Sequence, residues 1–305
     1  MSTVLVTGAS GFLGTEVCRV LSKEHDVYTL GRTQTFFKNI DADLSNQNIL
    51  LPEVSFEHIV HLAGKAHSYP KTDKEIEAFS LINYQGTINV LNALITQKNI
   101  KTFIFASTVA VYGVEFGENI KESYPTNPTT PYGKSKLSAE QYIIDWCIKK
   151  NINYLILRLP LIAGNNPPGN LGAMKRAIKK GYYIKIKGNQ SRKSVVIATD
   201  IADLISKFNW ESGIYNLTDG INPTFSEIEC ALEKSLNKQV RFKIPLNLLN
   251  KAALVGDFLQ KMKINIPINS FKIKKITSSL TFNDEKARKE LDWKPNSAIE
   301  YLSNN

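Results

Sequence analysis

The sequence predicts an α/β protein in which a doubly wound parallel sheet carries a smaller C-terminal lobe. Two observations support this prediction. Apolar, β-branched runs alternate with long helical periodicities in the first half of the chain, and a glycine-rich turn joins the first run to the first helix. Such alternation is typical of right-handed βαβ units. The 305 residues, 43% of them hydrophobic, suffice for one large domain and a smaller one.

The first expected strand, residues 3–6, runs directly into a turn with three glycines spaced three residues apart. The first two let the backbone turn sharply and approach a pyrophosphate, and the third lets the helix at 15–21 lie close to the strand. The helix N-terminus then directs its amides and positive dipole end at the phosphates. This turn predicts a dinucleotide site. Its candidate residues are Gly8, Ser10, Gly11, Phe12, Leu13 and Gly14.

The remaining elements follow in βαβ order. Strands are expected at 27–30, 58–63, 102–107 and 154–159, and long helices at 75–97 and 132–149. The polar, proline-rich run 164–170 ends this pattern. We therefore expect residues 1–163 and 193–220 to form an NAD(P)-binding Rossmann domain, and residues 164–192 and 221–305 to form the substrate-binding lobe. Within the first unit, 193–203 and 213–217 are expected to return to the main sheet.

The spacing GxxGxxG resembles that of the short-chain dehydrogenase/reductase superfamily, which implies a catalytic Tyr-x-x-x-Lys pair. Tyr132 and Lys136 supply it. The same spacing recurs at Tyr183 and Lys187, but that segment alternates like a strand, in which residues four apart lie too far from each other. Pro131 instead signals a helix start, which places Lys136 one turn along the face of Tyr132. An isolated tyrosine ionises near pH 10, too high for efficient proton exchange at neutral pH. An ammonium one helical turn away stabilises the phenolate and so lowers this pKa.

The same resemblance implies a hydroxyl residue at the end of an upstream strand. Thr108 takes that position when the chain is aligned on the following residues 109–113, and its hydroxyl can hold a substrate oxygen beside the phenol. Ser107, one residue earlier, is a candidate substrate contact. The alternative for Thr108 is a buried hydroxyl that the backbone satisfies. The resemblance also implies that Lys136 binds the nicotinamide ribose.

Further motifs resemble the extended branch of that superfamily, the nucleotide-sugar epimerases, dehydratases and reductases. The similar segments are 61–64, 83–87, 108–113, 127–136, 158–161, 167–171, 279–280 and 291–295. This resemblance implies that Asp43 and Leu44 contact adenine. It also implies that Asn170 and Leu171 seat the uridine diphosphate of a nucleotide-sugar substrate. The other cofactor-binding candidates are Leu62, Ala63, Gly64, Asn83, Tyr132, Lys136 and Leu159, and Asn83 is implied to support the active site.

Three activities compete within that branch. The dehydratases carry Asp-Glu directly after the catalytic threonine, whereas Val109 and Ala110 follow Thr108, so dehydration is not expected. The runs 127–130 and 168–171 resemble bacterial capsule and O-antigen proteins. We therefore expect NAD(P)H-dependent reduction of the C4 keto group of a UDP-4-keto-6-deoxy sugar in surface polysaccharide biosynthesis. The alternatives are a UDP-hexose or UDP-N-acetylhexosamine 4-epimerase with tightly bound NAD, and a catalytically inactive cofactor-binding scaffold.

Basic residues bear on the cofactor and the substrate. Arg32 follows the second strand, where a carboxylate would hold the ribose 2′-hydroxyl of NAD; an arginine there can accept a 2′-phosphate. NADP(H) is therefore favoured over NAD(H), unless Arg32 is an exposed loop residue. Lys193 stands where the branch usually has an arginine against the substrate phosphates, with Arg192 beside it. Either could clamp a diphosphate.

The formal net charge of +10 is spread along the chain without a helix-turn-helix signature or a basic cluster interleaved with aromatics. We therefore expect no nucleic-acid partner. The densest basic stretch, 251–275, also contains Leu, Phe, Ile and Pro. A solvated face of the small lobe is the favoured interpretation of this stretch, and a peripheral contact with an anionic membrane is the alternative.

Cysteines and histidines predict no metal site. Cys18, Cys147 and Cys230 lack metal or redox spacing, as expected of reduced thiols, and the four histidines form no ligand pattern. The sequence has neither a charged-then-apolar leader nor an apolar run of membrane-spanning length, so we expect a cytoplasmic protein. The helices at 75–97 and 132–149 resemble those that pair into a four-helix dimer interface in the superfamily, which implies a homodimer.

Overall fold

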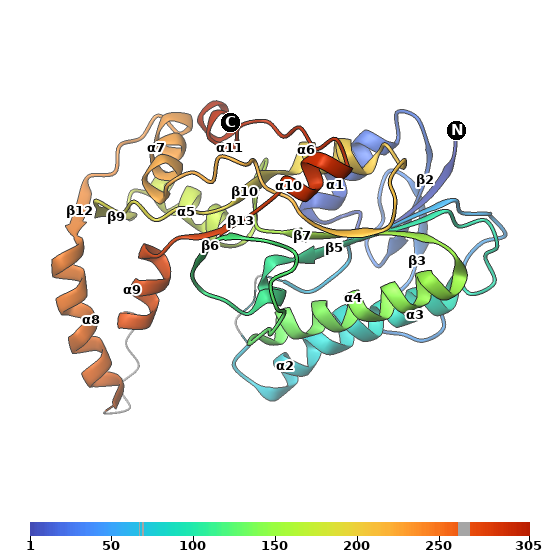
Figure 1. Ribbon diagram of the computed structural model, residues 1–305, viewed down its shortest axis with the longest axis horizontal. Coiled ribbons are helices and arrows are strands. Elements are labelled where there is room, and N and C mark those ends of the chain that lie inside the picture. The colour runs from blue at the N-terminus through green and yellow to red at the C-terminus, as the bar shows by residue number, and fades with distance from the viewer. Residues whose placement is uncertain (67, 69, 262–268) are drawn as a thin grey trace.

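A parallel sheet forms the middle layer of the larger part of the molecule (Figure 1). The computed structural model describes residues 1–66, 68, 70–261 and 269–305. The sheet has seven strands in the order β11-β7-β5-β4-β1-β2-β3, and all neighbouring strands are parallel. The strands are β1 (Thr3–Thr7), β2 (Asp26–Gly31), β3 (Lys38–Asp41), β4 (His58–His61), β5 (Thr102–Thr108), β7 (Asn153–Leu159) and β11 (Gly213–Asn216). The chain winds outward from β1 in both directions, which confirms the predicted doubly wound sheet.

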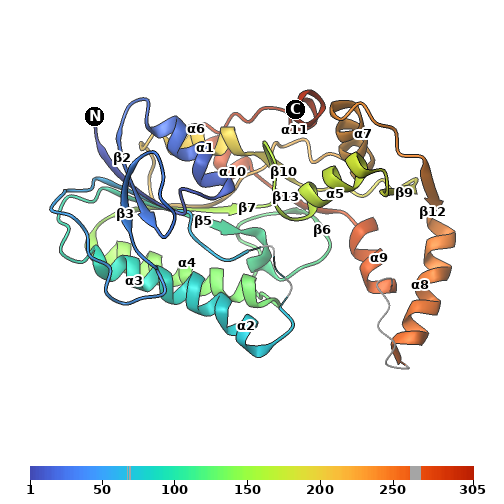
Figure 2. The same cartoon turned by 180° about the vertical axis from the view of Figure 1, so that it is seen from behind.

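Helices cover both faces of this sheet (Figures 1 and 2). One face carries α1 (Phe12–Leu21), α6 (Ala198–Ile205) and α10 (Glu285–Glu290). The opposite face carries α2 (Asp73–Phe79), the π-helix η1 (Ser80–Gln85), α3 (Gly86–Ala93) and α4 (Pro131–Lys150). The helix expected at 75–97 is a continuous helical run from Asp73 to Ala93 whose middle part, η1, is π-helical, and it ends earlier than expected.

Successive side chains along a strand point to opposite faces of the sheet, and in this sheet both faces are covered by helices. In β5, Ile104 packs into the apolar cluster under α1 and α6. Its neighbours Phe103 and Phe105 point the other way, into the cluster under α3 and α4. Strands covered by helices on both sides are expected to read as continuous apolar runs, as residues 103–106 do. The short edge strand β3 lacks such a run, and the sequence did not predict it.

The smaller lobe lies beyond the carboxyl ends of the strands (Figure 1). An apolar cluster joins α5 (Gly169–Lys180), α7 (Phe225–Ser235) and α11 (Ala298–Asn304) to a two-stranded ladder of β8 (Leu161–Ala163) and β10 (Val195–Ile197). The prediction that 193–203 return to the main sheet is wrong, because Val195 and Ile197 belong to this cluster and α6 then packs on α1. Gly213–Asn216 does join the main sheet, as predicted. The division of the chain at 163/164 and 192/193 stays a prediction.

A helical hairpin forms the end of the molecule opposite β3 (Figures 1 and 2). It consists of α8 (Leu246–Lys261) and α9 (Ser270–Thr277). A ladder of β12 (Phe242–Pro245) on β9 (Ile184–Lys187) leads into α8, and β13 (Leu280–Phe282), paired with β6 (Gly117–Ile120), follows α9. Within the described residues, no helix combines the length and the apolar character that crossing a bilayer requires.

Candidate active site

The glycine-rich turn after β1 has room for backbone only. Gly8 has φ +71°, and a Cβ added to it would lie 2.6 Å from the backbone nitrogen of Ala63. A Cβ on Gly14 would lie 2.1 Å from the carbonyl oxygen of Gly8. Both obstructing atoms belong to the backbone. Gly8 is therefore required where the segment after β4 approaches the turn, and Gly14 where α1 begins this close to β1. The turn therefore fits the close approach that a pyrophosphate requires.

The N-terminus of α1 is available to an anion. Gly11 is the N-cap residue, no side chain caps this end among the described residues, and the first turn contains no acidic residue. The first amides of a helix have no intrahelical partner and carry the positive end of its dipole. Ser10 and Gly11 are exposed and Phe12 is half-buried, whereas Leu13 packs into the core below the turn.

The residues after β4 lie against this turn. Thr7 binds them through its backbone and its side chain. Its carbonyl accepts from the Leu62 amide (3.2 Å), and its hydroxyl accepts from the Ala63 amide (3.2 Å). β1 and β4 are the adjacent strands at which the winding reverses, which is where doubly wound sheets bind ligands. Leu159, at the end of β7, is buried in the apolar cluster on the α1 side.

Asn83 joins the segment after β4 to α4. Its Oδ1 accepts from the Lys65 amide (2.6 Å), and its Nδ2 donates to the Lys65 carbonyl (3.0 Å) and to Ser135 Oγ (2.9 Å). A Cβ on Gly64 would lie 3.0 Å from Asn83 Oδ1 and 3.3 Å from Lys136 Nζ. Asn83 lies in the π-helical turn η1, a geometry that is frequent at functional sites.

The start of α4 positions Tyr132. Thr130 caps the helix by accepting from the Gly133 amide (3.1 Å), and Pro131 occupies the first turn. A Cβ on Gly133 would lie only 2.7 Å from the Ala110 carbonyl oxygen, so the helix start lies directly against η2 (Val109–Tyr112), the 3₁₀ turn after β5. Thr108, at the end of β5, precedes this turn, and its hydroxyl accepts from the Ala110 amide (3.2 Å), the backbone partner that the alternative for this residue expected.

Burial disfavours charge on both members of the tyrosine–lysine pair. It raises the pKa of Tyr132 to about 12, against which hydrogen bonding to the Thr108 hydroxyl acts. It lowers the pKa of Lys136 to about 7, against which the charge of Glu140 acts. Lys136 is 3% exposed, and its Nζ donates to the Ala106 carbonyl (2.8 Å). A phenolate here therefore depends on a positive charge held beside it.

Sequence reasoning missed Glu140, which lies one further turn along α4. Its carboxylate accepts a hydrogen bond from the Ser107 hydroxyl and pairs with Arg158 on β7 (2.8 Å). The hydroxyl of Ser107, predicted to contact substrate, is thus occupied within the protein. The spacing of Tyr132, Lys136 and Glu140 by four residues was a signal that could have found it.

His61, part of the segment 61–64 that resembles the extended branch, is a second buried polar residue for which sequence reasoning gave no role. Its Nδ1 lies 2.6 Å from the Thr7 hydroxyl and its Nε2 lies 2.9 Å from that of Thr87. Burial lowers its pKa to about 3, so the ring is neutral and links β1, β4 and α3. The described residues contain no group of three or more His, Cys, Asp or Glu that could hold a metal ion.

The predicted adenosine-binding residues lie together after β2 and β3. The Arg32 guanidinium is 77% exposed and lies 3.8 Å from the Asp43 carboxylate. Hydrogen bonds from the hydroxyl and amide of Ser45, followed by the charge of Arg32, hold the pKa of Asp43 below its usual value. The Leu44 carbonyl accepts from Asn89 on α3 (2.8 Å). Arg32 is thus a loop residue that faces a carboxylate.

The other four predicted substrate residues, besides Ser107, have different surroundings. Leu171 is 3% exposed and packs inside the smaller lobe, whereas Asn170 is exposed in the first turn of α5. Arg192 is exposed and donates to the Asn222 carbonyl (3.0 Å). Lys193 is half-buried and donates to the carbonyls at the C-terminal end of α9, and burial lowers its pKa to about 8.

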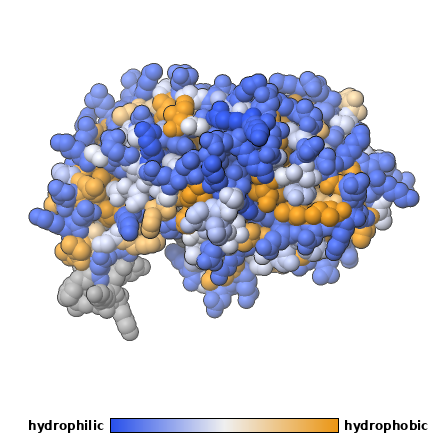
Figure 3. Space-filling view, viewed as in Figure 1, coloured by the Kyte–Doolittle hydropathy of each residue, from blue (hydrophilic) through white to orange (hydrophobic). Residues whose placement is uncertain are grey.

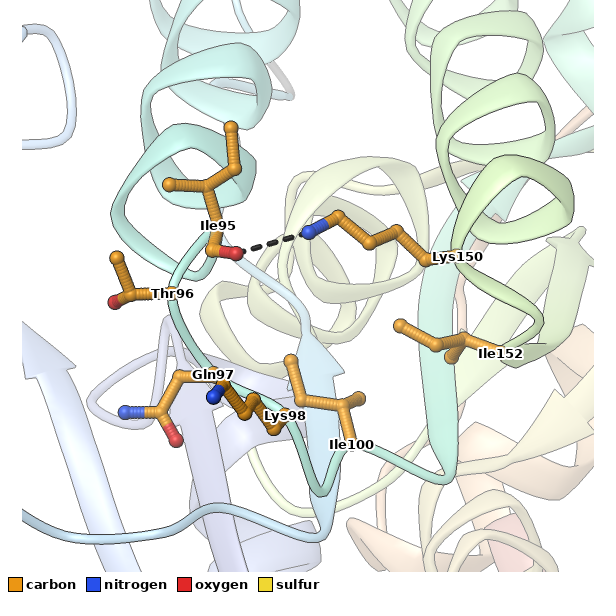
Figure 4. A pocket seen from close by; sticks show the side chains of 7 residues that line it. All are labelled: Ile95, Thr96, Gln97, Lys98, Ile100, Lys150 and Ile152. Carbon is orange, nitrogen blue, oxygen red and sulfur yellow. Dashed lines mark hydrogen bonds between the residues drawn. The ribbon is translucent and has the colours of Figure 1, made fainter.

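The pocket in Figure 4 lies away from these residues. It has a volume of about 360 Å³, and Lys150 Nζ donates across it to the Ile95 carbonyl (2.9 Å). Lys150 ends α4, whereas Tyr132 begins it, and 20 helical residues span about 30 Å. The lining residues are Ile95, Thr96, Gln97, Lys98, Ile100, Lys150 and Ile152. None of them is a predicted site residue.

Comparison with known proteins agrees with this geometry. A profile of the NAD dependent epimerase/dehydratase family matches residues 4–216. The chain belongs to this family. The match covers every strand of the main sheet, together with the glycine-rich turn, Thr108, Tyr132 and Lys136. The predicted membership of the extended short-chain dehydrogenase/reductase superfamily is therefore confirmed.

Relatives of this family member include several 4-epimerases. N-acetyl-alpha-D-glucosaminyl-diphospho-ditrans,octacis-undecaprenol 4-epimerase from Escherichia coli O157:H7 is 29% identical over 93% of this chain and 88% of its own length. The fold is similar to that of Thermotoga maritima UDP-glucose 4-epimerase with UDP-glucose (TM-score 0.77, 18% identity, 99% and 96% of the two chains). It is also similar to that of Bacillus cereus UDP-glucuronic acid 4-epimerase with NAD (TM-score 0.74, 19% identity, 99% and 97%).

Proposed function

We propose that this family member interconverts the C4 epimers of a hexose or N-acetylhexosamine that is linked to a diphosphate, with NAD bound throughout turnover. The observation that carries the proposal is the packing of the start of α4, which contains Tyr132, against the turn after Thr108, with the buried Lys136 beside Gly64 next to the dinucleotide turn. The relatives described above favour epimerisation over the 4-keto reduction expected from the sequence, because they are named 4-epimerases. Epimerisation, the alternative, therefore replaces reduction as our proposal.

The residues of this chain supply the proton chemistry. Bound NAD would supply a reversible hydride acceptor, and the glycine-rich turn and the segment after β4 would hold it. The Thr108 hydroxyl would hold the C4 oxygen, and Tyr132 would accept the proton of the C4 hydroxyl as the C4 hydrogen leaves as hydride. Once the 4-keto sugar presents its other face, Tyr132 would return the proton to the C4 oxygen. Lys136 would stabilise the intervening phenolate.

We propose NAD rather than NADP as the cofactor. The preference for NADP(H) depended on Arg32, but the guanidinium is 77% exposed and the carboxylate of Asp43 lies 3.8 Å from it. A negatively charged neighbour disfavours a 2′-phosphate and suits a ribose hydroxyl. An epimerase also needs no exchange of cofactor between turnovers, since it returns the hydride that it removes.

In the names of the relatives, the carrier attached to the sugar through the diphosphate takes two chemical forms. It is a nucleoside in UDP-glucose and a polyprenol in the E. coli enzyme's name. Both forms share the diphosphate, for which Lys193 and the N-terminus of α5 at Asn170 are the candidates in this chain. The half-buried ammonium of Lys193, with two carbonyl partners, would meet the diphosphate as a point charge.

A reductant-free assay tests this proposal. Purified protein is incubated with UDP-N-acetylglucosamine or UDP-glucose, and separately with N-acetylglucosaminyl diphospho-undecaprenol in detergent, and the released sugars are analysed for the C4 epimer. Epimer formation without added nicotinamide supports the proposal. Stoichiometric loss of NADPH absorbance with a UDP-4-keto-6-deoxy sugar, without epimer formation, would instead establish the reductase.

Two further expectations remain proposals. The α3 and α4 helices pack side by side and are the candidate homodimer interface; Ile148, near the end of α4, is 65% exposed. Size-exclusion chromatography with light scattering would measure the oligomeric state. The cytoplasmic location also stays a prediction.

A further inference from the structure

The helical hairpin α8–α9 leaves large apolar side chains exposed at the end of the molecule. On α8, Leu248 is 59% exposed, Leu254 65% and Val255 58%, and on α9 Phe271 is 61% exposed. Figure 3 shows apolar surface at this end, among polar side chains, and a hollow between this end and the part of the molecule that contains α2. Scattered single apolar residues are normal on a surface, but several on one hairpin are not.

Helical spacing places the apolar residues of α8 on one side. Leu248 and Val255 are seven residues apart, so they lie on nearly the same line along the helix, and Leu254 lies beside them. Lys251, also exposed, lies between them on that side. Ala253 and Gly256 form the buried side of the helix. Leu246 and Leu249 are half-buried on that same inward side, so α8 is apolar inward and also carries three large apolar residues on its exposed side.

The sequence of the hairpin segment is basic. Residues 246–277 include six lysines and one acidic residue, Asp257. Asp257 Oδ1 accepts from the Ser270 amide at the start of α9 (3.0 Å), so the carboxylate serves the contact between the two helices. On α9, Lys274 and Lys275 are exposed three and four residues after Phe271. The Lys274 ammonium lies 4.7 Å from the centre of the Phe116 ring, and Lys275 pairs with Glu115 (2.5 Å).

We propose that the exposed residues of the hairpin, Leu248, Lys251, Leu254 and Val255 on α8 with Phe271 on α9, dock on the surface of an anionic phospholipid bilayer. The apolar side chains would enter the boundary between headgroups and acyl chains, and the lysines would meet the lipid phosphates. Charge complementarity favours this partner, because apolar residues interleaved with lysines suit an anionic interface. The hairpin lies on the interface and does not span the bilayer, in keeping with its length and composition.

Docking there would place the lipid surface next to the candidate diphosphate residue. Lys193 Nζ donates to the carbonyls of Lys275 (3.1 Å) and Ser278 (2.8 Å), at the C-terminal end of α9. The same hydrogen bonds join the hairpin to the strand-like segment that carries Lys193. A sugar diphosphate anchored in the bilayer could then reach the site without leaving the membrane. This inference does not rest on the proposed epimerisation, since bilayer binding is measured without substrate.

Vesicle flotation tests the proposal. The full chain is mixed with vesicles of phosphatidylcholine containing about one-third phosphatidylglycerol, and with vesicles of phosphatidylcholine alone, and the bound fraction is measured at low and high salt. We expect binding to the anionic vesicles, at least about tenfold weaker binding to neutral ones, and loss of binding as salt rises. Equal binding to both vesicles, or binding to neither, would overturn the proposal.

Matched variants locate the contact. Leu254→Asp and Lys251→Glu should each weaken binding to anionic vesicles about tenfold or more, while Leu50→Asp, at an exposed leucine outside the hairpin, should leave it unchanged. Turnover on a water-soluble substrate and the thermal unfolding midpoint check that the variants are folded. If Leu254→Asp instead converts a dimer to a monomer and vesicle binding is unchanged, a second copy of the chain covers this side and the proposal fails.

Discussion

Glu140 on α4 and Arg158 on β7 form an ion pair of 2.8 Å whose side chains are 2% and 4% exposed. Arg158 Nε also donates to both carboxylate oxygens (3.2 and 3.3 Å), and the guanidinium lies 4.9 Å from the centre of the Tyr112 ring. The Ser107 hydroxyl donates to the same carboxylate. The pair therefore joins the helix that carries Lys136 to the strand ends where the site lies.

Removing one partner of this pair should destabilise the protein strongly. Arg158→Met leaves Glu140 buried without its counter-charge, which typically costs about 3–5 kcal/mol of unfolding free energy. The double variant Glu140→Leu/Arg158→Met removes both charges and should recover at least half of that loss. Urea unfolding of the three proteins provides the measurement. A double variant no more stable than Arg158→Met would show that packing, and not the unpaired charge, accounts for the loss.

Replacing Tyr132 by Phe should abolish most turnover and leave the cofactor bound. The phenol hydroxyl is the proton carrier, and loss of a general acid–base typically lowers the rate about 10²- to 10⁴-fold. The ring remains, so packing near Phe79, whose ring centre lies 6.2 Å away, is retained. Turnover is followed by epimer formation, and retained NAD is measured after denaturation. Near-normal turnover would remove Tyr132 from the proposed chemistry.

His61 should make stability depend on pH in the acid range. Burial lowers its pKa to about 3 in the folded protein, below the value near 6.5 that it has when unfolded. Between these values the unfolded chain binds more protons, so this contribution to stability is present above pH 6.5 and is lost as the pH falls towards 3. As the pH falls through that interval, the unfolding free energy of the His61→Asn variant should decrease less than that of the wild type. Parallel pH profiles in a urea titration would contradict this assignment.

Alanine at Gly14 should disrupt the dinucleotide turn, whereas alanine at Gly31 should be tolerated. A Cβ at Gly14 would meet the Gly8 carbonyl oxygen at 2.1 Å, and backbone cannot give way without moving α1 from β1. At Gly31 nothing lies within 4 Å. We expect Gly14→Ala to cost about 1–3 kcal/mol or more and to release bound NAD, with Gly31→Ala within about 1 kcal/mol of wild type. Retained NAD in Gly14→Ala would argue against a phosphate at this turn.

Arg32→Ala should change NAD binding little. The guanidinium is exposed and its ion pair with Asp43 has a separation of 3.8 Å, a kind of pair that contributes little in water. We expect less than about a fivefold change in NAD affinity by fluorescence titration. A much larger loss of affinity for NADP than for NAD in this variant would restore Arg32 as a 2′-phosphate ligand.

The sequence by itself determined the local features of this protein. The apolar run of β5 predicted a strand because alternate side chains must be buried on both faces of a covered sheet. The glycine spacing predicted the turn before α1, since only glycine permits those backbone approaches. Pro131 distinguished Tyr132 and Lys136 on a helix from Tyr183 and Lys187, of which the second lies in strand β9. Each depends on residues within one or two turns of each other.

Only the tertiary structure decided which distant residues meet. Glu140 and Arg158 belong to different elements, and no local period shows that they pair. Val195–Ile197 reads as a strand, yet its partner is β8 and not the main sheet, because the cluster of the smaller lobe buries it. Arg32 faces a carboxylate that follows another strand. Such contacts arise from how the elements pack, and packing depends on the whole chain at once.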